Sequence, residues 1–127
     1  MSRPLTGQLE VVGYGVRLVA GSFAPNGSSA LVAANFKGQG FTAAYTSQGL
    51  FTVTLANLDV RAVLSYLAFN QSASAAARFA QGGNVNVSAG TIEVRTVDGS
   101  GNVQNQNADA QTRVHIALFL ATSTLND

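Results

Sequence analysis

The sequence predicts an all-β protein, a single-domain β-sandwich of about eight strands with jelly-roll or Greek-key-like wiring. Three observations predict it: short segments of alternating apolar and polar residues recur along the chain, turn residues separate them at regular spacing, and no long stretch has the period of an amphipathic helix. With 127 residues the chain is long enough for one domain with its own core. A sandwich is the natural solution because two packed sheets bury the apolar face of each strand.

The clearest element is a β-hairpin over residues 37–55. Its connection, residues 46–49, is polar and ends in glycine, which is typical of a hairpin turn. On both sides of the turn, apolar residues alternate with residues that face the other way: Phe41, Ala43, Tyr45, Phe51, Val53 and Leu55. This alternation predicts two strands that bury one face each against another layer.

The chain before the hairpin contains two further predicted strands. Residues 1–8 have little periodicity and predict an N-terminal arm, so the sandwich domain is expected to span residues 9–127. The first strand is predicted over residues 9–20 and the second over residues 29–36. Between them, the Ala-Pro-Asn-Gly sequence at residues 24–27 predicts a turn.

After the hairpin, residues 63–69 predict a strand that is apolar on both faces. Residues 70–80 are small and polar and predict a loop with some helical character, which the glycine pair at residues 82–83 ends. Strands are predicted over residues 84–89 and 91–97. In the second, Ile92 and Val94 are expected to face inward, while Glu93 and Arg95 are expected to face water.

The last part of the chain predicts a tight turn at residues 98–102 and a polar loop at residues 103–111. The turn begins like a calcium loop, but the later bidentate glutamate of such a loop is missing, which favours a simple turn. The last strand is predicted over residues 113–121, with this apolar row facing the core: Val114, Ile116, Leu118 and Leu120.

The opposite face of the last strand carries His115, Ala117 and Phe119. A phenylalanine that faces away from the core predicts that this face is also covered, at a contact between subunits. His115 is the only histidine in the chain, which excludes a histidine-rich metal site and favours a surface or interface role over catalysis. We therefore expect Phe119, His115 and Ala117 to line an oligomer interface.

Charge is sparse: only 10% of the residues are charged and the formal net charge is +1, whereas soluble domains usually have about 25% charged residues. This argues against nucleic acid as a partner, because binding to phosphates needs clustered lysines and arginines. A polar, weakly charged surface suits either simple solubility or close contact with other chains. No apolar run is long enough to span a bilayer and the start lacks a signal peptide, so we expect neither a membrane partner nor export.

The search for catalytic chemistry predicts no enzyme, no metal and no cofactor. The sequence has no cysteine, no nucleophile elbow, no phosphate-binding loop and no dinucleotide fingerprint. The six carboxylates are scattered, and nothing in the sequence selects a catalytic pair among them. Tryptophan is absent, so a saccharide site would have to use a tyrosine: Tyr14, Tyr45 or Tyr66.

Four stretches together resemble the small β-sandwich structural proteins of tailed bacteriophages, and most closely their capsid decoration (cement) proteins. They are GQGFT at residues 38–42, GLFTVTL at 49–55, GTIEVRT at 90–96 and RVHIALFL at 113–120. The similarity is one of pattern and covers most of the chain from Gly13 on. Phage fibre domains share these patterns, and no contact residue is carried over from the family.

The resemblance implies a virion protein that is made in the host cytoplasm and sits on the capsid surface. Its partners would be itself, as a homotrimer, and the major capsid protein, whose subunit contacts it would brace against internal DNA pressure. Two alternatives stay open. A tail-fibre or receptor-binding domain would attach to a host-surface saccharide, through tyrosines and the loop at residues 98–112. An enzyme of unknown type would need a pocket with clustered carboxylates.

Overall fold

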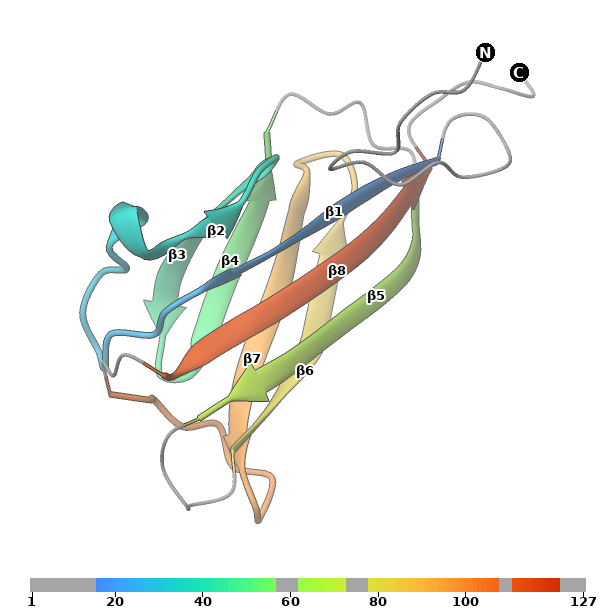
Figure 1. Ribbon diagram of the computed structural model, residues 1–127. Helices are drawn as coiled ribbons and strands as arrows, with labels where there is room; N and C mark the ends of the chain where they lie inside the picture. Colours follow the sequence, from blue (N-terminus) through green and yellow to red (C-terminus); the bar gives the residue numbers. More distant parts are fainter. Residues whose placement is uncertain (1–15, 57–61, 73–77, 108–110, 122–127) are drawn as a thin grey trace.

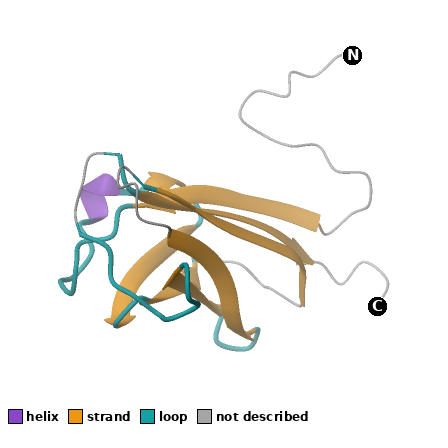
Figure 2. Ribbon diagram, turned by 90° about the horizontal axis from the view of Figure 1, so that it is seen from below, coloured by secondary structure: helices purple, strands orange, loops and turns teal. Residues whose placement is uncertain are grey.

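The computed structural model describes residues 16–56, 62–72, 78–107 and 111–121. This part of the chain is a β-sandwich of two four-stranded sheets, which confirms the predicted fold class (Figure 1). The strands are β1 (Val16–Phe23), β2 (Lys37–Gly38), β3 (Phe41–Ser47), β4 (Leu50–Leu55), β5 (Ala62–Gln71), β6 (Arg78–Asn86), β7 (Thr91–Asp98) and β8 (Arg113–Ala121). A short 3-10 helix, η1 (Ala33–Asn35), precedes β2. Figure 2 shows the two layers of strands, with this helical turn at one end.

The strand order is β2-β1-β8-β5 in one sheet, called sheet A here, and β3-β4-β7-β6 in the other, called sheet B. All strand pairs are antiparallel. The pairing is nested, because β1 pairs with β8 in sheet A while β4 pairs with β7 in sheet B. Strands far apart in the sequence therefore become neighbours, as the predicted jelly-roll or Greek-key wiring requires.

The core lies between the sheets and follows the alternation of the strands. In β8 every second side chain is buried, from Val114 to Leu120, and in β4 the same holds for Phe51, Val53 and Leu55. Burying each large apolar side chain contributes about 1.5–3 kcal/mol, so these rows stabilise the fold most. The buried cluster consists of Val19, Phe23, Phe41, Phe51, Val53, Leu55, Ile92, Val94, Val114, Ile116, Leu118 and Leu120.

On one side of the sandwich, the aromatic ring of Tyr66 packs against Gly82 and connects the two sheets. The Tyr66 ring of β5 reaches across to β6, where a Cβ at Gly82 would lie only 2.4 Å from Tyr66 Cε2. The Tyr66 hydroxyl donates a hydrogen bond of 3.0 Å to the Glu93 backbone carbonyl. Burial, followed by the nearby Glu93 charge, raises the pKa of Tyr66 well above its ordinary value. Tyr66 therefore joins the two sheets and stays neutral.

One end of the sandwich is held by the loop that leaves β7. Thr96 Oγ1 donates to the Gln104 carbonyl at 2.7 Å, and the Gln104 amide donates to the Thr96 carbonyl at 2.9 Å. Farther along, Asn105 Oδ1 accepts hydrogen bonds from the Gly49 amide at 2.7 Å and from the Tyr45 hydroxyl at 3.1 Å. These hydrogen bonds attach the loop to the turn of the β3–β4 hairpin.

The turn predicted at residues 98–102 is confirmed. Asp98 Oδ1 accepts hydrogen bonds from the backbone amides of Ser100 and Asn102, at 2.9 and 3.0 Å. The bond from Asn102, followed by the bond from Ser100, lowers the pKa of the Asp98 carboxyl, because both stabilise its ionised form. The carboxylate is therefore used to hold the turn.

The second predicted strand, residues 29–36, is wrong. The chain there is a loop that contains η1, and the strand next to β1 is the two-residue β2. The alternating pattern has a different origin: Phe36 stacks on Phe41 with ring centroids 6.2 Å apart, while Val32 is 48% exposed. Among the described strands, the one that pairs with this side of β1 is β2, which follows the segment.

The start of the sixth strand is also corrected. Strand β6 begins at Arg78, within the predicted loop, and continues through Gly82 and Gly83. The sequence predicts that the two glycines end a loop, but they lie within the strand, where the register to β7 shifts between Gly82 and Val85. Glycine is needed here because Tyr66 occupies the space of a side chain.

The predicted strand at residues 63–69 and the predicted hairpin and last strand are confirmed as β5, β3–β4 and β8. The N-terminal arm predicted at residues 1–8, and the first part of the strand predicted from residue 9, lie outside the described residues. From Val16 on, that strand is present and continues to Phe23.

We predict that Gly82→Ala destabilises the fold by about 1–3 kcal/mol, because the added methyl group forces the Tyr66 ring out of its packed position. Chemical denaturation of the purified protein measures this. The control is Gln81→Ala, at the exposed neighbour in the same strand, which should change the free energy of unfolding by less than about 0.5 kcal/mol. Equal stability of the Gly82→Ala and Gln81→Ala variants would contradict the assignment.

Candidate interaction face

The candidate site is the outer face of sheet A, on the side away from the core. Because side chains alternate across a strand, the partners of outward residues in β8 also point outward. Three cross-strand rows result, each with one residue from β1, β8 and β5: Leu18–Phe119–Ser65, Ala20–Ala117–Leu67 and Ser22–His115–Phe69. We call these nine residues the sheet A face.

The sheet A face exposes two large apolar side chains next to each other on the edge strand β5. Leu67 is 59% exposed and Phe69 is 53% exposed. Beside Leu67, the row continues with two small side chains, Ala117 and Ala20. Adjacent exposed apolar residues are typical of a contact surface, whereas single exposed ones need no explanation.

The Phe69 ring is held by the histidine of the neighbouring strand. The rings of Phe69 and His115 are stacked, with centroids 4.8 Å apart and an angle of 11° between their planes. His115 Nε2 lies 2.9 Å from Gln71 Oε1, at hydrogen-bond distance. Burial, followed by the nearby Arg113 charge, lowers the pKa of His115 below its ordinary value of 6.5. The neutral imidazole therefore fits this environment best.

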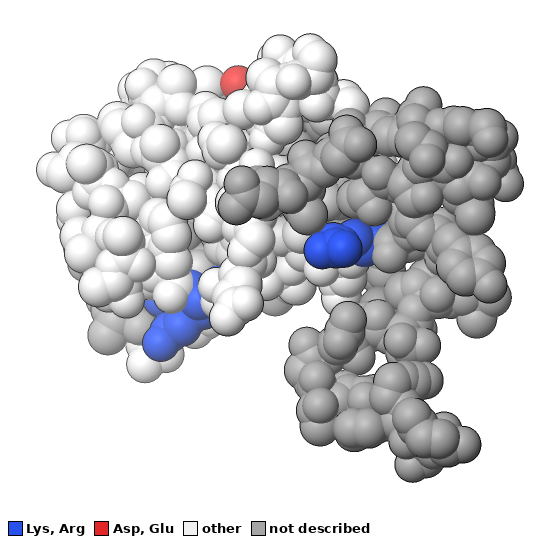
Figure 3. Space-filling view, turned by 90° about the horizontal axis from the view of Figure 1, so that it is seen from above, with Lys and Arg blue, Asp and Glu red and all other residues white. Residues whose placement is uncertain are grey.

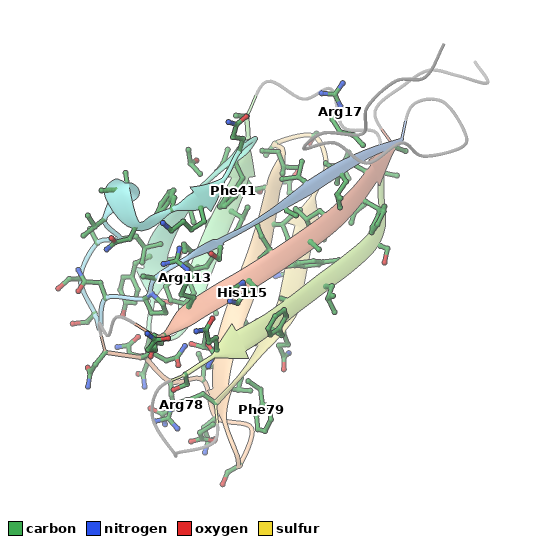
Figure 4. The ribbon with its side chains drawn as sticks, viewed as in Figure 1. Arg17, Phe41, Arg78, Phe79, Arg113 and His115 are labelled. Atoms are coloured by element: carbon green, nitrogen blue, oxygen red, sulfur yellow. The ribbon has the colours of Figure 1, made fainter. Side chains whose placement is uncertain are left out.

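The charged group nearest to the sheet A face on β8 is Arg113, which binds within its own chain (Figure 4). Its Nε donates to Ser22 Oγ at 2.8 Å, and its Nη2 donates to the backbone carbonyls of Ser22 and Asn35. These bonds bury the Ser22 side chain and fasten η1 to sheet A. Lys37 of β2 pairs with Ser22 and adds a second cation at this border.

Sheet B exposes polar groups and also two large apolar side chains of β6, Phe79 at 56% and Val85 at 43%. It carries threonines of the hairpin, with Thr46 and Thr52 joined by a hydroxyl hydrogen bond of 2.7 Å. Glu93 and Arg95 form an ion pair there, with 2.8 Å between Oε1 and Nη2. The prediction that these two face water is met in direction, although both are only part-exposed. Figure 3 shows how little of the visible described surface is acidic or basic.

Metal and saccharide sites are two other kinds of site that the sequence brings into question. The described residues contain no group of three or more histidine, cysteine, aspartate or glutamate side chains that could hold a metal. The tyrosines considered for a saccharide site are used internally: Tyr45 donates to Asn105 and Tyr66 to Glu93, while Tyr14 lies outside the described ranges. Within the described ranges, no helix is long and apolar enough to span a membrane.

The three predicted interface residues lie together on β8, and all three are half-buried. Their role in an interface stays a prediction. Sequence reasoning missed Leu67 and Phe69, which are the most exposed apolar side chains of the face. The sequence did contain a signal for an exposed apolar row, because residues 63–69 are predicted to be apolar on both faces. Only the pairing of β5 with β8 shows which of the two rows is exposed.

The aromatic side chains are divided between the core and the surface. Phe23, Phe41 and Phe51 are buried, but Phe69 and Phe79 are more than half exposed. Aromatic residues therefore supply only part of the core, and aliphatic side chains of β7 and β8 supply much of the rest. Phe69 belongs to the candidate site.

Comparisons of the chain with protein-family models, with curated proteins and with solved structures found no significant match.

We predict that Arg113→Ala destabilises the fold by about 1–3 kcal/mol, because three acceptors lose a charged donor and η1 loses its attachment. Arg113→Lys should recover only part of the loss, since an ammonium group lacks the planar fork of the guanidinium. Thermal or denaturant unfolding measures both. The control is Arg17→Ala, at an exposed arginine of β1. If Arg17→Ala lowered the free energy of unfolding as much as Arg113→Ala does, the structural role of the Arg113 hydrogen bonds would be contradicted.

Proposed function

We propose that this chain is a viral structural protein, a capsid decoration (cement) protein that binds the outer surface of a tailed-phage head. In this role it associates with itself as a homotrimer and stabilises contacts between major-capsid subunits. The observation that carries the proposal is the sheet A face, an apolar surface with no acidic residue, presented by a rigid sandwich. The sequence resemblance to decoration proteins gives the proposal its biological setting.

The composition of the face supports contact with another protein chain. Its members are apolar or small, apart from two serines and one histidine, and Ser22 is already satisfied by Arg113. Covering such a face removes apolar area from water and leaves few polar groups to desolvate. Interface cores show the same depletion of charge and enrichment in aromatic residues.

A protein that braces contacts between capsid subunits also needs to be rigid, and a β-sandwich with a packed core is suited to this. The strand that carries Phe119, Ala117 and His115 on one side carries four core residues on the other. Among the described residues, no buried side-chain nitrogen or oxygen lacks a hydrogen-bond partner. A surface that stands on a well-packed core is preorganised, and preorganisation reduces the entropic cost of association.

The copy number in purified virions tests the proposed function. Quantitative mass spectrometry gives the amount of this chain per major capsid protein. A ratio near stoichiometric is expected for a decoration protein spread over the shell. A few copies per particle would instead indicate a tail-fibre or receptor-binding component, and absence from virions would overturn both structural roles.

We predict that Leu67→Asp dissociates the purified oligomer with little loss of fold stability, because this side chain is mostly exposed in the single chain. Phe119→Asp should also dissociate it, with some additional cost to the fold because Phe119 is half-buried. Sedimentation velocity measures the oligomeric state. Thr54→Asp, on the exposed side of β4 in sheet B, is the matched control and should leave the oligomer intact. An intact oligomer in both sheet A variants would show that the face is not the interface.

A further inference from the structure

We propose that Asn26 is a modification site of this chain, where the side-chain amide deamidates to aspartate or isoaspartate at a rate that the fold controls through Gln106. The reaction consumes water and needs no other protein. The inference goes beyond the proposed function and does not depend on it, because it rests on one turn and on the chemistry of its backbone.

Asn26 is the one asparagine of the sequence that is followed by glycine. In deamidation, the backbone nitrogen of Gly27 loses its proton and forms a bond to Cγ of Asn26, while the side-chain nitrogen leaves as ammonia. Water then adds to either carbonyl carbon of the resulting cyclic imide and breaks the bond from that carbon to the ring nitrogen, which gives aspartate or isoaspartate. Glycine favours the first step, because it has no Cβ beside the attacking nitrogen and its backbone adapts readily to the ring.

The turn itself favours this reactive pair of residues. Gly27 has a φ of 61°, in the left-handed region where glycine is preferred. Asn26 closes the turn with its side chain, because its Nδ2 donates a hydrogen bond of 3.0 Å to the Ala30 carbonyl. Both residues are part-exposed and residues 28–30 are exposed, so water reaches the reacting atoms. Protection must therefore come from hydrogen bonds rather than from burial.

In the folded chain both reacting groups are bound to other partners. The Gly27 amide donates to the Gln106 carbonyl at 2.7 Å, while the Asn26 amide is bound to Ala30. A backbone N–H that donates to a carbonyl keeps its proton and directs its nitrogen toward that acceptor. Attack on Cγ of Asn26 therefore requires that the bond between Gly27 and Gln106 opens first.

The acceptor of this bond is itself fixed to sheet A. Gln106 is only 6% exposed, and its side-chain amide forms two hydrogen bonds with that of Asn70, at 3.0 and 2.6 Å. Asn70 lies in β5 and pairs with Val114 of β8. We call the Gly27–Gln106 bond and the two Asn70–Gln106 bonds the Gln106 latch. The rate of deamidation of Asn26 in the folded chain then depends on the fraction of time for which the Gln106 latch is open.

The products of the reaction do not restore the turn. An aspartate at residue 26 has no side-chain N–H, so its carboxylate faces the Ala30 carbonyl as a second acceptor. An isoaspartate adds one carbon to the backbone and displaces the Gly27 amide from the Gln106 carbonyl. Modification therefore weakens the contacts that delayed it, and the turn is expected to stay open afterwards.

The test is peptide mapping by mass spectrometry after incubation of the full chain at mildly alkaline pH. The wild type is incubated folded and also denatured in guanidinium chloride, together with two folded variants. In the denatured chain, Asn26 should deamidate faster than every other asparagine. In the folded wild type, it should react at least about tenfold more slowly. Asn70→Ala, which removes the anchor of Gln106, should raise the folded-state rate at Asn26 several-fold.

The control is Gly82→Ala, which is expected to destabilise the fold without touching the Gln106 latch. It should leave the rate at Asn26 near that of the folded wild type. An equal increase in Gly82→Ala and Asn70→Ala would show that global unfolding limits the reaction, and would overturn the role of the latch. Equal rates at Asn26 in the folded and denatured wild type would overturn the protection, and slower reaction than at another asparagine in the denatured chain would overturn the site.

Hydrogen exchange at the Gly27 amide gives a second readout that does not require the reaction. The amide should be protected in the wild type and exchange faster in Asn70→Ala and in Asn26→Asp, which is the aspartate product itself. Unprotected exchange at Gly27 in the folded wild type would overturn the inference even if Asn70→Ala failed to fold.

Discussion

The structure depends on the alternation of β8 between its two neighbours β1 and β5. One row of this strand, from Val114 to Leu120, fills the core, and the other row, from Arg113 to Ala121, lies on the outside of sheet A. A shift of one residue in the pairing would exchange the two rows and place His115 in the core. Core packing and the candidate interaction face are therefore two consequences of one strand register, which is set by pairs such as Gly21 with Ile116.

The two sheets expose different combinations of side chains. Sheet B exposes threonines and an ion pair, together with Phe79 and Val85 of its edge strand β6. Sheet A exposes Leu67 and Phe69 beside alanines, with Arg113 and Lys37 at one border. A low overall charge could serve solubility or contact equally, but two adjacent exposed apolar side chains within a row of small residues favour contact on the sheet A face. The structural role proposed for this chain uses that face.

An element could be predicted correctly from the sequence where its residue pattern arises from the burial of its own faces. Predictions failed where the pattern arises from contacts with residues far away in the sequence. The β3–β4 hairpin and β8 were predicted correctly because their alternation reflects one buried face each. Residues 29–36 alternate as well, yet Phe36 packs on Phe41 from a loop. Gly82 looked like a breaker because its reason, the Tyr66 ring of another sheet, is remote in sequence. The β8 part of the site was predicted because the alternation of β8 is visible in its own sequence. The exposure of Leu67 and Phe69 could not be predicted in this way, because it depends on the pairing of β5 with β8.

Side-chain oxidation by hydroxyl radicals measures directly whether the sheet A face is covered when the protein assembles. Phe69 and Phe79 are matched probes, because they are 53% and 56% exposed in the single chain and lie on different sheets. We expect Phe69 to be protected from oxidation in the assembled protein and to become reactive when the protein is dissociated, while Phe79 should react in both states. Equal oxidation of Phe69 and Phe79 in the assembled protein would contradict this expectation.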